Sequence, residues 1–436
     1  MIKLLHLSDI HMGSGFAHGQ INPATGLNTR LEDFIAALTR CIDHALAEPV
    51  DLVLFGGDAF PDATPPPFVQ QAFARQFCRL SEAGIPTVLL VGNHDQHAQG
   101  TGGASLSIYR TLGVPDVIVG DSLTTHRITT RNGMVQVVTL PWLNHSTLLT
   151  RPETEGLTMA QVGDLLLDRL RVALEGEIRR LNPSWPTVLL AHAMVDTASY
   201  GAERFLAAGR GFTIPMAMLA RPCFDYVALG HVHRHQILCE QPLMVYPGSI
   251  ERVDFSEEKE DKGYMLVRLE QGQVEADFCV LPVRPFKTIK VDLTEAEYPQ
   301  EQLLQAIHQT SIEGAVVRCL YILRSDQVEH IDQGAIAAAL IAAHSYSLQP
   351  EVAVQTSRSR LPELGTNNTL DPITALEAYL HHRPDLEDIS EAMVAAAAGL
   401  LANEPDRVTV EDWLTAQDWA DYDLAAADDS QQLRLL

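Results

Sequence analysis

Seven Asp, Asn and His residues occur in short polar motifs, each of which directly follows an apolar run. They are Asp9, His11, Asp58, Asn93, His192, His231 and His233. Carboxylate oxygens, amide oxygens and imidazole nitrogens are the ligands that divalent first-row metal ions take from proteins. Two such ions held side by side are suited to the hydrolysis of phosphate esters. The residue types therefore predict a two-metal phosphoesterase site.

The apolar runs that precede the motifs are short and rich in Val, Ile and Leu, which is typical of buried strands. They cover residues 2–7, 52–55, 87–91, 187–191 and 226–229. Stretches with helical spacing alternate with them, at 30–47, 68–83 and 161–181. An alternation of this kind predicts a layered α/β fold. Because the carboxyl ends of strands in one sheet meet at one crevice, we expect the motifs to converge there.

Position along the motifs assigns each ligand to one of two metals. Asp58 ends a central strand after two glycines and is the expected bridge between the ions. The first metal is assigned Asp9, His11 and His233. The second metal is assigned Asn93, His192 and His231. Mixed oxygen and nitrogen ligation favours Mn²⁺ over Mg²⁺, with Fe²⁺ and Zn²⁺ as alternatives.

His94 directly follows the ligand Asn93, so we expect it to stand beside the metals without binding them. There it would donate a hydrogen bond or a proton to the leaving oxygen. Asp95 is the candidate for orienting His94, although an Asp after a His is also a common turn and cap residue.

Net charge argues against tight binding of a polyanion by this chain alone. The chain of 436 residues carries a formal charge of −25, and residues 286–436 hold 9 basic against 25 acidic side chains. Cations on Asp9 and Asp58 would offset part of the acidity of the remainder, so DNA is not excluded. Six scattered cysteines without a Cys-x-x-Cys pair indicate reduced thiols. No run approaches the roughly 18 apolar residues of a membrane helix.

These motifs and their order resemble the calcineurin-like metallophosphoesterase superfamily and, within it, the SbcD family of bacterial repair nucleases. The SbcD-like segments are residues 9–13, the Gly57-Asp58 loop with Pro65-Pro66, and residues 92–95, 225–233 and 246–250. The resemblance implies a metallophosphoesterase β-sandwich flanked by helices in four αββα layers. It also implies a cytoplasmic, nucleoid-associated homodimer that cuts DNA ends, hairpins and single strands. Its partner would be an SbcC-type coiled-coil ABC ATPase.

Two features of the loops bear on this resemblance. Related archaeal and eukaryotic nucleases carry a second His three residues after the bridging Asp, where this chain has Pro61. The loop 246–250 lies near the active site in the resembled family. This makes Ser249 and Arg252 candidates for substrate contact, with a plain turn as the alternative. The loop 14–27 is expected to shape the DNA entrance or to be an insertion.

The resemblance and the composition together predict the domains. We expect a nuclease domain at 1–283, an α+β capping domain at 286–350, a linker at 351–369, a helical pair at 370–402 and an acidic tail at 403–436. Within the first domain, 243–246, 263–269 and 274–281 are expected to form an antiparallel meander. The helical pair has an apolar stripe that is expected to dock the ATPase. The stripe consists of Leu376, Tyr379, Leu380, Leu386, Ile389 and Met393. The alternative is a hairpin that packs only on its own chain.

We therefore predict hydrolysis of DNA phosphodiesters by a metal-activated water that attacks in line. One alternative is a phosphodiesterase or phosphomonoesterase for small phosphate esters, which would have little need of the capping module. The second alternative is an inactive scaffold, against which the full set of ligands and His94 argue.

Overall fold

The computed structural model describes residues 1–97, 103–143, 156–201, 213–353, 372–381, 383 and 386–402. The chain divides into two compact units, residues 1–353 and 354–436. The first unit holds all seven candidate metal ligands. Among the described residues, no helix is long and apolar enough to cross a bilayer.

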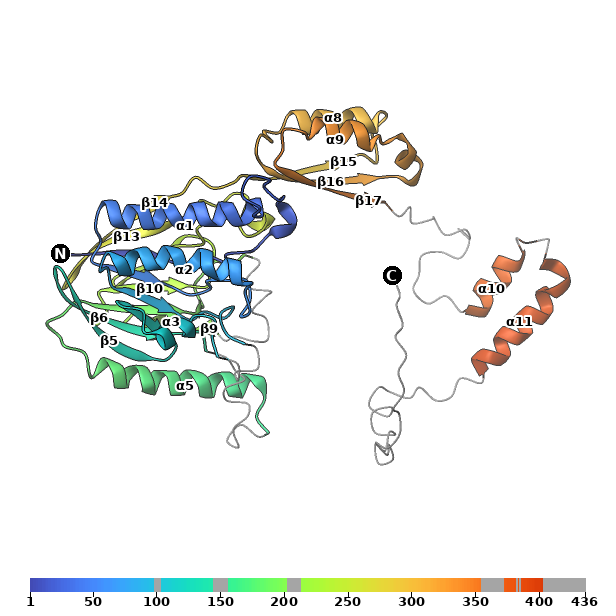
Figure 1. Ribbon diagram of the computed structural model, residues 1–436. Coiled ribbons are helices and arrows are strands. Elements are labelled where there is room, and N and C mark those ends of the chain that lie inside the picture. The colour runs from blue at the N-terminus through green and yellow to red at the C-terminus, as the bar shows by residue number, and fades with distance from the viewer. Residues whose placement is uncertain are drawn as a thin grey trace, which may run out of the picture. The chain divides into compact units, whose positions relative to one another are not determined.

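Two mixed sheets form the body of the first unit (Figure 1), and each has six strands among the described residues. The first sheet has the order β14-β13-β1-β2-β3-β4. Its strands are β1 (Ile2–Leu7), β2 (Leu52–Phe55), β3 (Thr87–Leu90), β4 (Val117–Gly120), β13 (Gly263–Glu270) and β14 (Gln273–Val280). The second sheet has the order β11-β12-β10-β7-β6-β5. Its strands are β5 (Thr124–Thr130), β6 (Gly133–Leu140), β7 (Thr187–His192), β10 (Tyr226–Gly230), β11 (Gln236–Glu240) and β12 (Leu243–Tyr246).

Helices cover the outer face of each sheet, which gives the four αββα layers expected from the sequence. On the first sheet lie α1 (Thr29–Ala47) and α2 (Pro67–Glu82), together with the short α3 (Ser107–Leu112). On the second lie α5 (Met159–Ile178) and α7 (Met216–Leu219). A separate apolar core, including Leu54, Val88 and Tyr226, fills the space between the sheets. The predicted fold class is confirmed.

Local sequence explains where the long helices begin. The Asn28 side chain accepts a hydrogen bond from the Arg30 backbone N–H at 2.9 Å and so caps α1. Thr158 and Gln161 form a reciprocal capping box at the start of α5. The helices predicted from apolar spacing at 30–47, 68–83 and 161–181 are confirmed, with ends that differ by no more than three residues.

Two expectations about the sheets are wrong. The motif-bearing strands do not share one sheet, because β1, β2 and β3 belong to the first and β7 and β10 to the second. The second concerns the predicted meander, whose first strand is misplaced: β12 pairs in parallel with β10 in the second sheet, whereas β13 and β14 form the expected antiparallel hairpin, beside β1 in the first. The segment between β12 and β13 passes from one sheet to the other. Nearness in sequence had suggested direct pairing.

The module at 286–353 is a small three-stranded parallel sheet, fully described, with two helices. Its elements are β15 (Phe286–Asp292), α8 (Pro299–His308), β16 (Val316–Leu323), α9 (Gln333–Ala339) and β17 (Ser345–Val352). Arg284, just before it, makes a bidentate ion pair with Asp33 of α1, with N–O distances of 2.6 and 2.7 Å. His344 bonds the Thr29 hydroxyl at 2.8 Å. The predicted role of the module at 286–353 as a capping domain stays a prediction.

The second unit contains the expected helical pair, α10 (Pro372–His381) and α11 (Glu387–Ala402), which contact each other. Tyr379, Ile389 and Met393 are exposed to 39%, 49% and 38%. Leu380, in contrast, is buried. Leu380 is therefore not available to a partner in this conformation, which corrects its place in the predicted stripe.

Candidate metal centre

The candidate ligands meet because both sheets end at the same edge of the sandwich. β1, β2 and β3 run parallel to one another, as do β7 and β10, so their carboxyl ends lie together. Gly56 and Gly230 allow the two sheets to touch here. A Cβ atom on Gly230 would lie 2.1 Å from the Gly56 carbonyl oxygen, which no larger residue tolerates.

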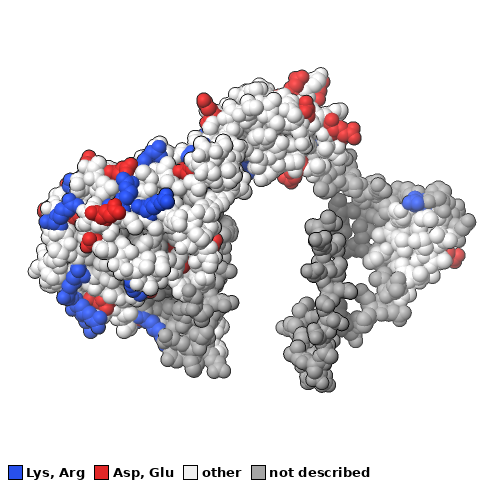
Figure 2. Space-filling model, in the orientation of Figure 1, with Lys and Arg blue, Asp and Glu red and all other residues white. Residues whose placement is uncertain are grey.

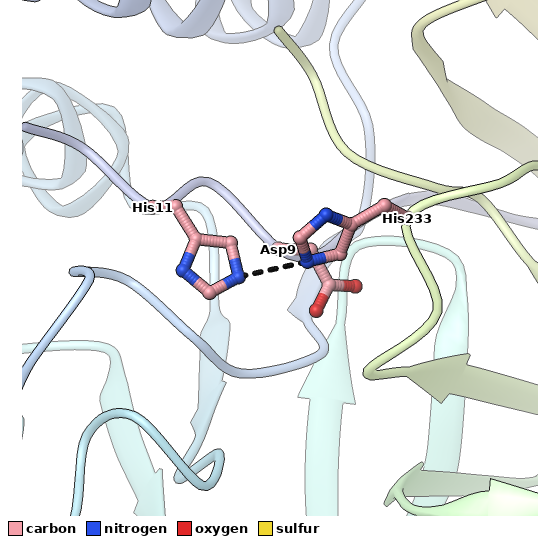
Figure 3. A group of neighbouring side chains, drawn as sticks. All are labelled: Asp9, His11 and His233. Carbon is pink, nitrogen blue, oxygen red and sulfur yellow. Dashed lines mark hydrogen bonds between the residues drawn. The ribbon is translucent and has the colours of Figure 1, made fainter. Parts of the chain in front are cut away.

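The first cluster consists of Asp9, His11 and His233 (Figure 3). Asp9 and His11 follow β1, whereas His233 comes from the loop after β10. The Nε2 atoms of His11 and His233 are 3.0 Å apart, and one ligand atom from each residue lies within 4.8 Å of the others. All three side chains are buried. This is the set assigned to the first metal.

The second cluster consists of Asp58, Asn93, His192 and His231. Asn93 Oδ1 lies 2.9 Å from His192 Nε2 and 2.9 Å from His231 Nδ1. Asp58 Oδ2 is 3.4 Å from His192 Nε2. The same oxygen is 3.6 Å from His11 Nε2 in the first cluster. Asp58 therefore occupies the position that a bridging carboxylate requires.

The backbone is strained at several of these residues. Among the described non-glycine residues with positive φ are Asp9 (51°), His11 (46°), Asp58 (60°) and His231 (107°). Residues other than glycine rarely adopt a positive φ, and such strain concentrates at functional sites. Asp116 (57°) is the remaining described case and lies outside the site. The fold thus maintains unfavourable backbone angles where the ligands are presented.

Electrostatics at the site call for added positive charge. Burial alone would raise the pKa of Asp58, but His192 holds that pKa well below its usual range. Burial likewise would lower the pKa of His192, yet the Asp58 carboxylate raises it to about 9. The pKa of Asp9 is raised because burial outweighs the favourable effect of His192 and His233. A divalent ion would supply the positive charge that the buried Asp9 carboxylate needs.

The donor set fits two such ions. The Nδ1 of His192 donates to the Gly56 carbonyl at 2.6 Å, so in the neutral ring Nε2 carries the free electron pair that faces the cluster. The pKa values of His11 and His231 lie well below the usual value because of burial, which keeps these rings neutral and able to ligate. Among the described residues, His231 Nε2 is buried without a hydrogen-bond partner.

His94 stands beside the clusters, with its ring 4.9 Å from that of His11. Its Nδ1 donates to the Pro61 carbonyl at 2.7 Å, and its backbone N–H donates to Asp58 Oδ1 at 2.8 Å. It also lies close enough to His11 and Asp58 to form a third candidate ligand group. The Pro61 carbonyl, three residues after Asp58, therefore orients His94.

The prediction that Asp95 orients His94 is wrong. The buried Asp95 carboxylate accepts from the backbone N–H groups of Asp58, Ala59 and Gly92 at 2.9, 3.1 and 2.9 Å. Burial is the main reason that the pKa of Asp95 rises to about 6. Asp95 thus fixes the two ligand-bearing loops after β2 and β3 to each other. This is the alternative role, that of a turn and cap residue.

The two candidate substrate contacts are also not supported. Ser249 is fully buried, and its Oγ donates to Glu257 Oε2 at 3.4 Å. The Arg252 guanidinium donates to the main-chain carbonyls of Glu257, Glu260 and Arg284 at 3.1, 2.8 and 3.1 Å. Both side chains hold the segment between β12 and β13, so neither is free to contact substrate.

Sequence reasoning missed Glu257. Its Oε1 accepts from Nδ1 of His233 at 2.6 Å, and it lies on the short 3₁₀ helix η3 (Phe255–Glu257). It is separated from His233 by 24 residues and belongs to no ligand motif. A carboxylate behind a ligating His is a recurring support of metal sites, but only the structure reveals which one.

The clusters open into a small pocket of about 170 Å³. It is lined by His11, Ser14, Asp58, Pro61, Asn93, His94, His231, His233 and Val253. His94 and ligands of both clusters therefore face one space.

The fold and this site define a phosphoesterase of the two-metal type. The sequence profile of the calcineurin-like phosphoesterase family matches residues 2–235, more than half of the chain. The chain belongs to this family, which uses a centre of two metal ions.

Curated relatives are distant. The uncharacterized metallophosphoesterase YhaO of Bacillus subtilis (strain 168) is 27% identical over 305 residues, covering 68% of this chain and 64% of that protein. The SbcD component of the SbcCD nuclease of Escherichia coli (strain K12) is 24% identical over 391 residues, covering 86% and 93%. The DNA double-strand break repair protein Mre11 of Haloferax volcanii is 27% identical over 322 residues, covering 73% and 60%. The chain thus spans less than two thirds of YhaO and of Mre11.

Proposed function

We propose that this protein is a metal-dependent DNA nuclease, the nuclease component of an SbcCD-type repair complex. The observation that carries the proposal is the extent of its similarity to the SbcD component of the Escherichia coli nuclease. The family profile ends at residue 235, but this alignment covers 86% of the chain and therefore includes the whole module at 286–353. A family member for small esters would share only the catalytic body.

The clusters give each side chain a task. Asp9, His11, Asp58 and His233 would hold one ion, and Asp58, Asn93, His192 and His231 the other. When bound, the two ions would polarise the phosphate and activate a water molecule; oxygen and nitrogen ligands favour Mn²⁺.

His94 would contribute proton chemistry at Nε2. The Pro61 carbonyl can only accept, so Nδ1 of His94 carries a hydrogen in either charge state. Nε2 can therefore donate to the leaving oxygen only when the ring is protonated, and it accepts a proton when the ring is neutral. His94 lines the pocket that ligands of both clusters share, which supports this role.

The acidic net charge of this chain supports a DNA-binding surface that is shared with a partner protein. On the face shown in Figure 2, Lys and Arg side chains lie among acidic ones over the body that contains the two large sheets, whereas the module at 286–353 presents mainly acidic side chains. A chain with a formal charge of −25 gains little from phosphate contacts alone. We therefore propose that a coiled-coil ATPase of the SbcC type supplies further DNA contacts, and that two copies of this chain act together as a homodimer.

The ATPase would dock on α10 and α11. Their exposed apolar side chains, Tyr379, Ile389 and Met393, are joined by the half-buried Leu376 and Leu386. Such a stripe suits helix-in-groove recognition.

The test is hydrolysis of DNA with free or hairpin ends, compared with bis(p-nitrophenyl) phosphate, in Mn²⁺. We expect Mn²⁺-dependent cleavage of DNA by the purified chain, and loss of cleavage in His94→Asn. Turnover of the small ester without DNA cleavage, with or without the ATPase, would favour the small-ester alternative. Absence of both activities in protein with two bound ions would favour a scaffold.

A further inference from the structure

We propose that Glu257, held in place by Lys262, is a positioning residue that sets the affinity of the first metal position through His233. The inference rests on the two-ion function proposed above. It concerns a pair of charged side chains, Glu257 and Lys262, that lie outside the motifs and are bonded to His233.

Glu257 is placed to fix the orientation and tautomer of His233. Its Oε1 accepts from His233 Nδ1 at 2.6 Å, so Nδ1 carries the hydrogen and Nε2 is left to ligate. That Nε2 is the atom that lies 3.0 Å from His11 Nε2 in the first cluster. A carboxylate behind an imidazole also makes the ring a stronger metal ligand.

Lys262 holds the Glu257 carboxylate where it is needed. Its side chain is fully buried, which is costly for an ammonium group unless it is paired. Nζ lies 2.8 Å from Glu257 Oε2, 2.8 Å from Glu260 Oε2 and 3.0 Å from the His233 carbonyl oxygen. The lysine thus binds both the carboxylate and the backbone of the histidine that the carboxylate orients.

A backbone contact also fixes the Glu257 carboxylate. The Val253 backbone N–H donates to Oε2 at 3.0 Å. Glu257 therefore has few alternative positions.

The second cluster has a different support. His192 Nδ1 donates to a neutral carbonyl, that of Gly56. A charged carboxylate thus stands behind His233 of the first position, whereas a neutral carbonyl stands behind His192 of the second. Loss of Glu257 should weaken the first position selectively.

The test is a titration of Mn²⁺ into chelator-treated full-length protein, with the heat of binding measured by isothermal titration calorimetry. Wild type should bind two ions. Glu257→Gln, which keeps the shape but removes the charge, should weaken one of the two sites by about 10–100-fold and leave the other unchanged. In a His192→Asn background, Glu257→Gln should leave no tight site. The matched control is Glu258→Gln, because Glu258 instead accepts from the Thr288 backbone N–H at 3.0 Å.

A double variant separates positioning from folding. Glu257→Leu with Lys262→Met removes both buried charges together, a change that proteins often tolerate. It should fold, as judged by circular dichroism, yet lose the same site, and it decides the question if Glu257→Gln does not fold. Two sites of wild-type affinity in either folded variant would overturn the inference. If wild type binds two ions but cuts no DNA, the nuclease proposal fails. The effect of Glu257→Gln on metal affinity is still measured independently in that case.

Discussion

Asp58 presents one carboxylate oxygen to a histidine nitrogen of each cluster, at 3.4 and 3.6 Å. Its replacement removes the only atom in the proposed ligand set that is shared by both metal positions. We expect Asp58→Ala to lose two-ion occupancy and at least ~10³-fold in activity, with the fold retained. Metal analysis and calorimetry of the purified variant measure this. Two tightly bound ions in Asp58→Ala would refute the ligand assignment.

His94 is expected to act on the reaction without holding the ions. His94→Asn should retain both metals and DNA binding, while hydrolysis falls by roughly 10²–10⁴-fold, the range for losing a general acid or charge stabiliser. The measurements are metal content and single-turnover cleavage. His94 also lies within reach of His11 and Asp58, so a fall in metal content would instead make it a ligand.

At the residue scale, the position of seven candidate ligands after buried strands was enough to predict that they lie close together. Each lies at the end of a buried strand or just after it, and parallel strands bring the residues at their carboxyl ends to a common edge. Supporting contacts could not be predicted in the same way. Asp95 clamps backbone N–H groups instead of His94, and Glu257 reaches His233 across 24 residues. Such contacts depend on how loops fold back, which no local spacing encodes.

At the element scale, the long amphipathic helices and the Val- and Leu-rich strands were predictable, because burial imposes a pattern. The strands β5, β11 and β17 were not anticipated. Their residues are mixed in polarity and only partly buried, as in Thr124–Thr130 and Ser345–Val352. Partner choice also escaped prediction, since β12 joins the second sheet and β13 the first. A strand's neighbour is decided by the whole sandwich.

The helical pair carries its own prediction. Leu376→Asp with Ile389→Asp should abolish co-purification with the coiled-coil ATPase, because each large apolar anchor contributes about 1.5–3 kcal/mol when buried. The nuclease should keep its metal-dependent activity on short DNA ends. Ala395→Asp, which adds the same charge at another exposed position of α11, serves as the control. Equal recovery of wild type and the double variant would show that the hairpin serves only its own chain.

At the scale of the whole molecule, His6 joins the two sheets. This buried residue of β1 bonds the Tyr226 hydroxyl at 2.9 Å and the Leu229 carbonyl at 3.1 Å, both on β10. Burial lowers the pKa of His6 to about 3. Between that value and about 6.5, the unfolded chain binds a proton that the folded chain does not.

Stability should therefore fall as the pH drops from about 6 toward 4. His6 alone should reduce the free energy of unfolding by up to about 1.4 kcal/mol per pH unit. Urea denaturation of chelator-treated protein at several pH values measures the slope. His6→Gln should be less stable at pH 7. Its free energy of unfolding should change less steeply with pH, by up to about 1.4 kcal/mol per pH unit, because one proton fewer is taken up on unfolding. Equal slopes would mean that His6 is not the group responsible.

Gly56 and Gly230 bring the two sheets into backbone contact at the edge where the ligands lie. A hydrogen bond from the His231 N–H to Asp9 Oδ1, at 3.0 Å, also crosses between the sheets there. Ions bound across the edge would tie the two sheets together, and local opening would begin there once they are withdrawn. Deuterium uptake measured by mass spectrometry should then rise in the peptides around Asp9 and His231 on chelation. Peptides from the middle of β1 and β10 should exchange as slowly as before, whereas uniform uptake would show that the ions do not hold this edge.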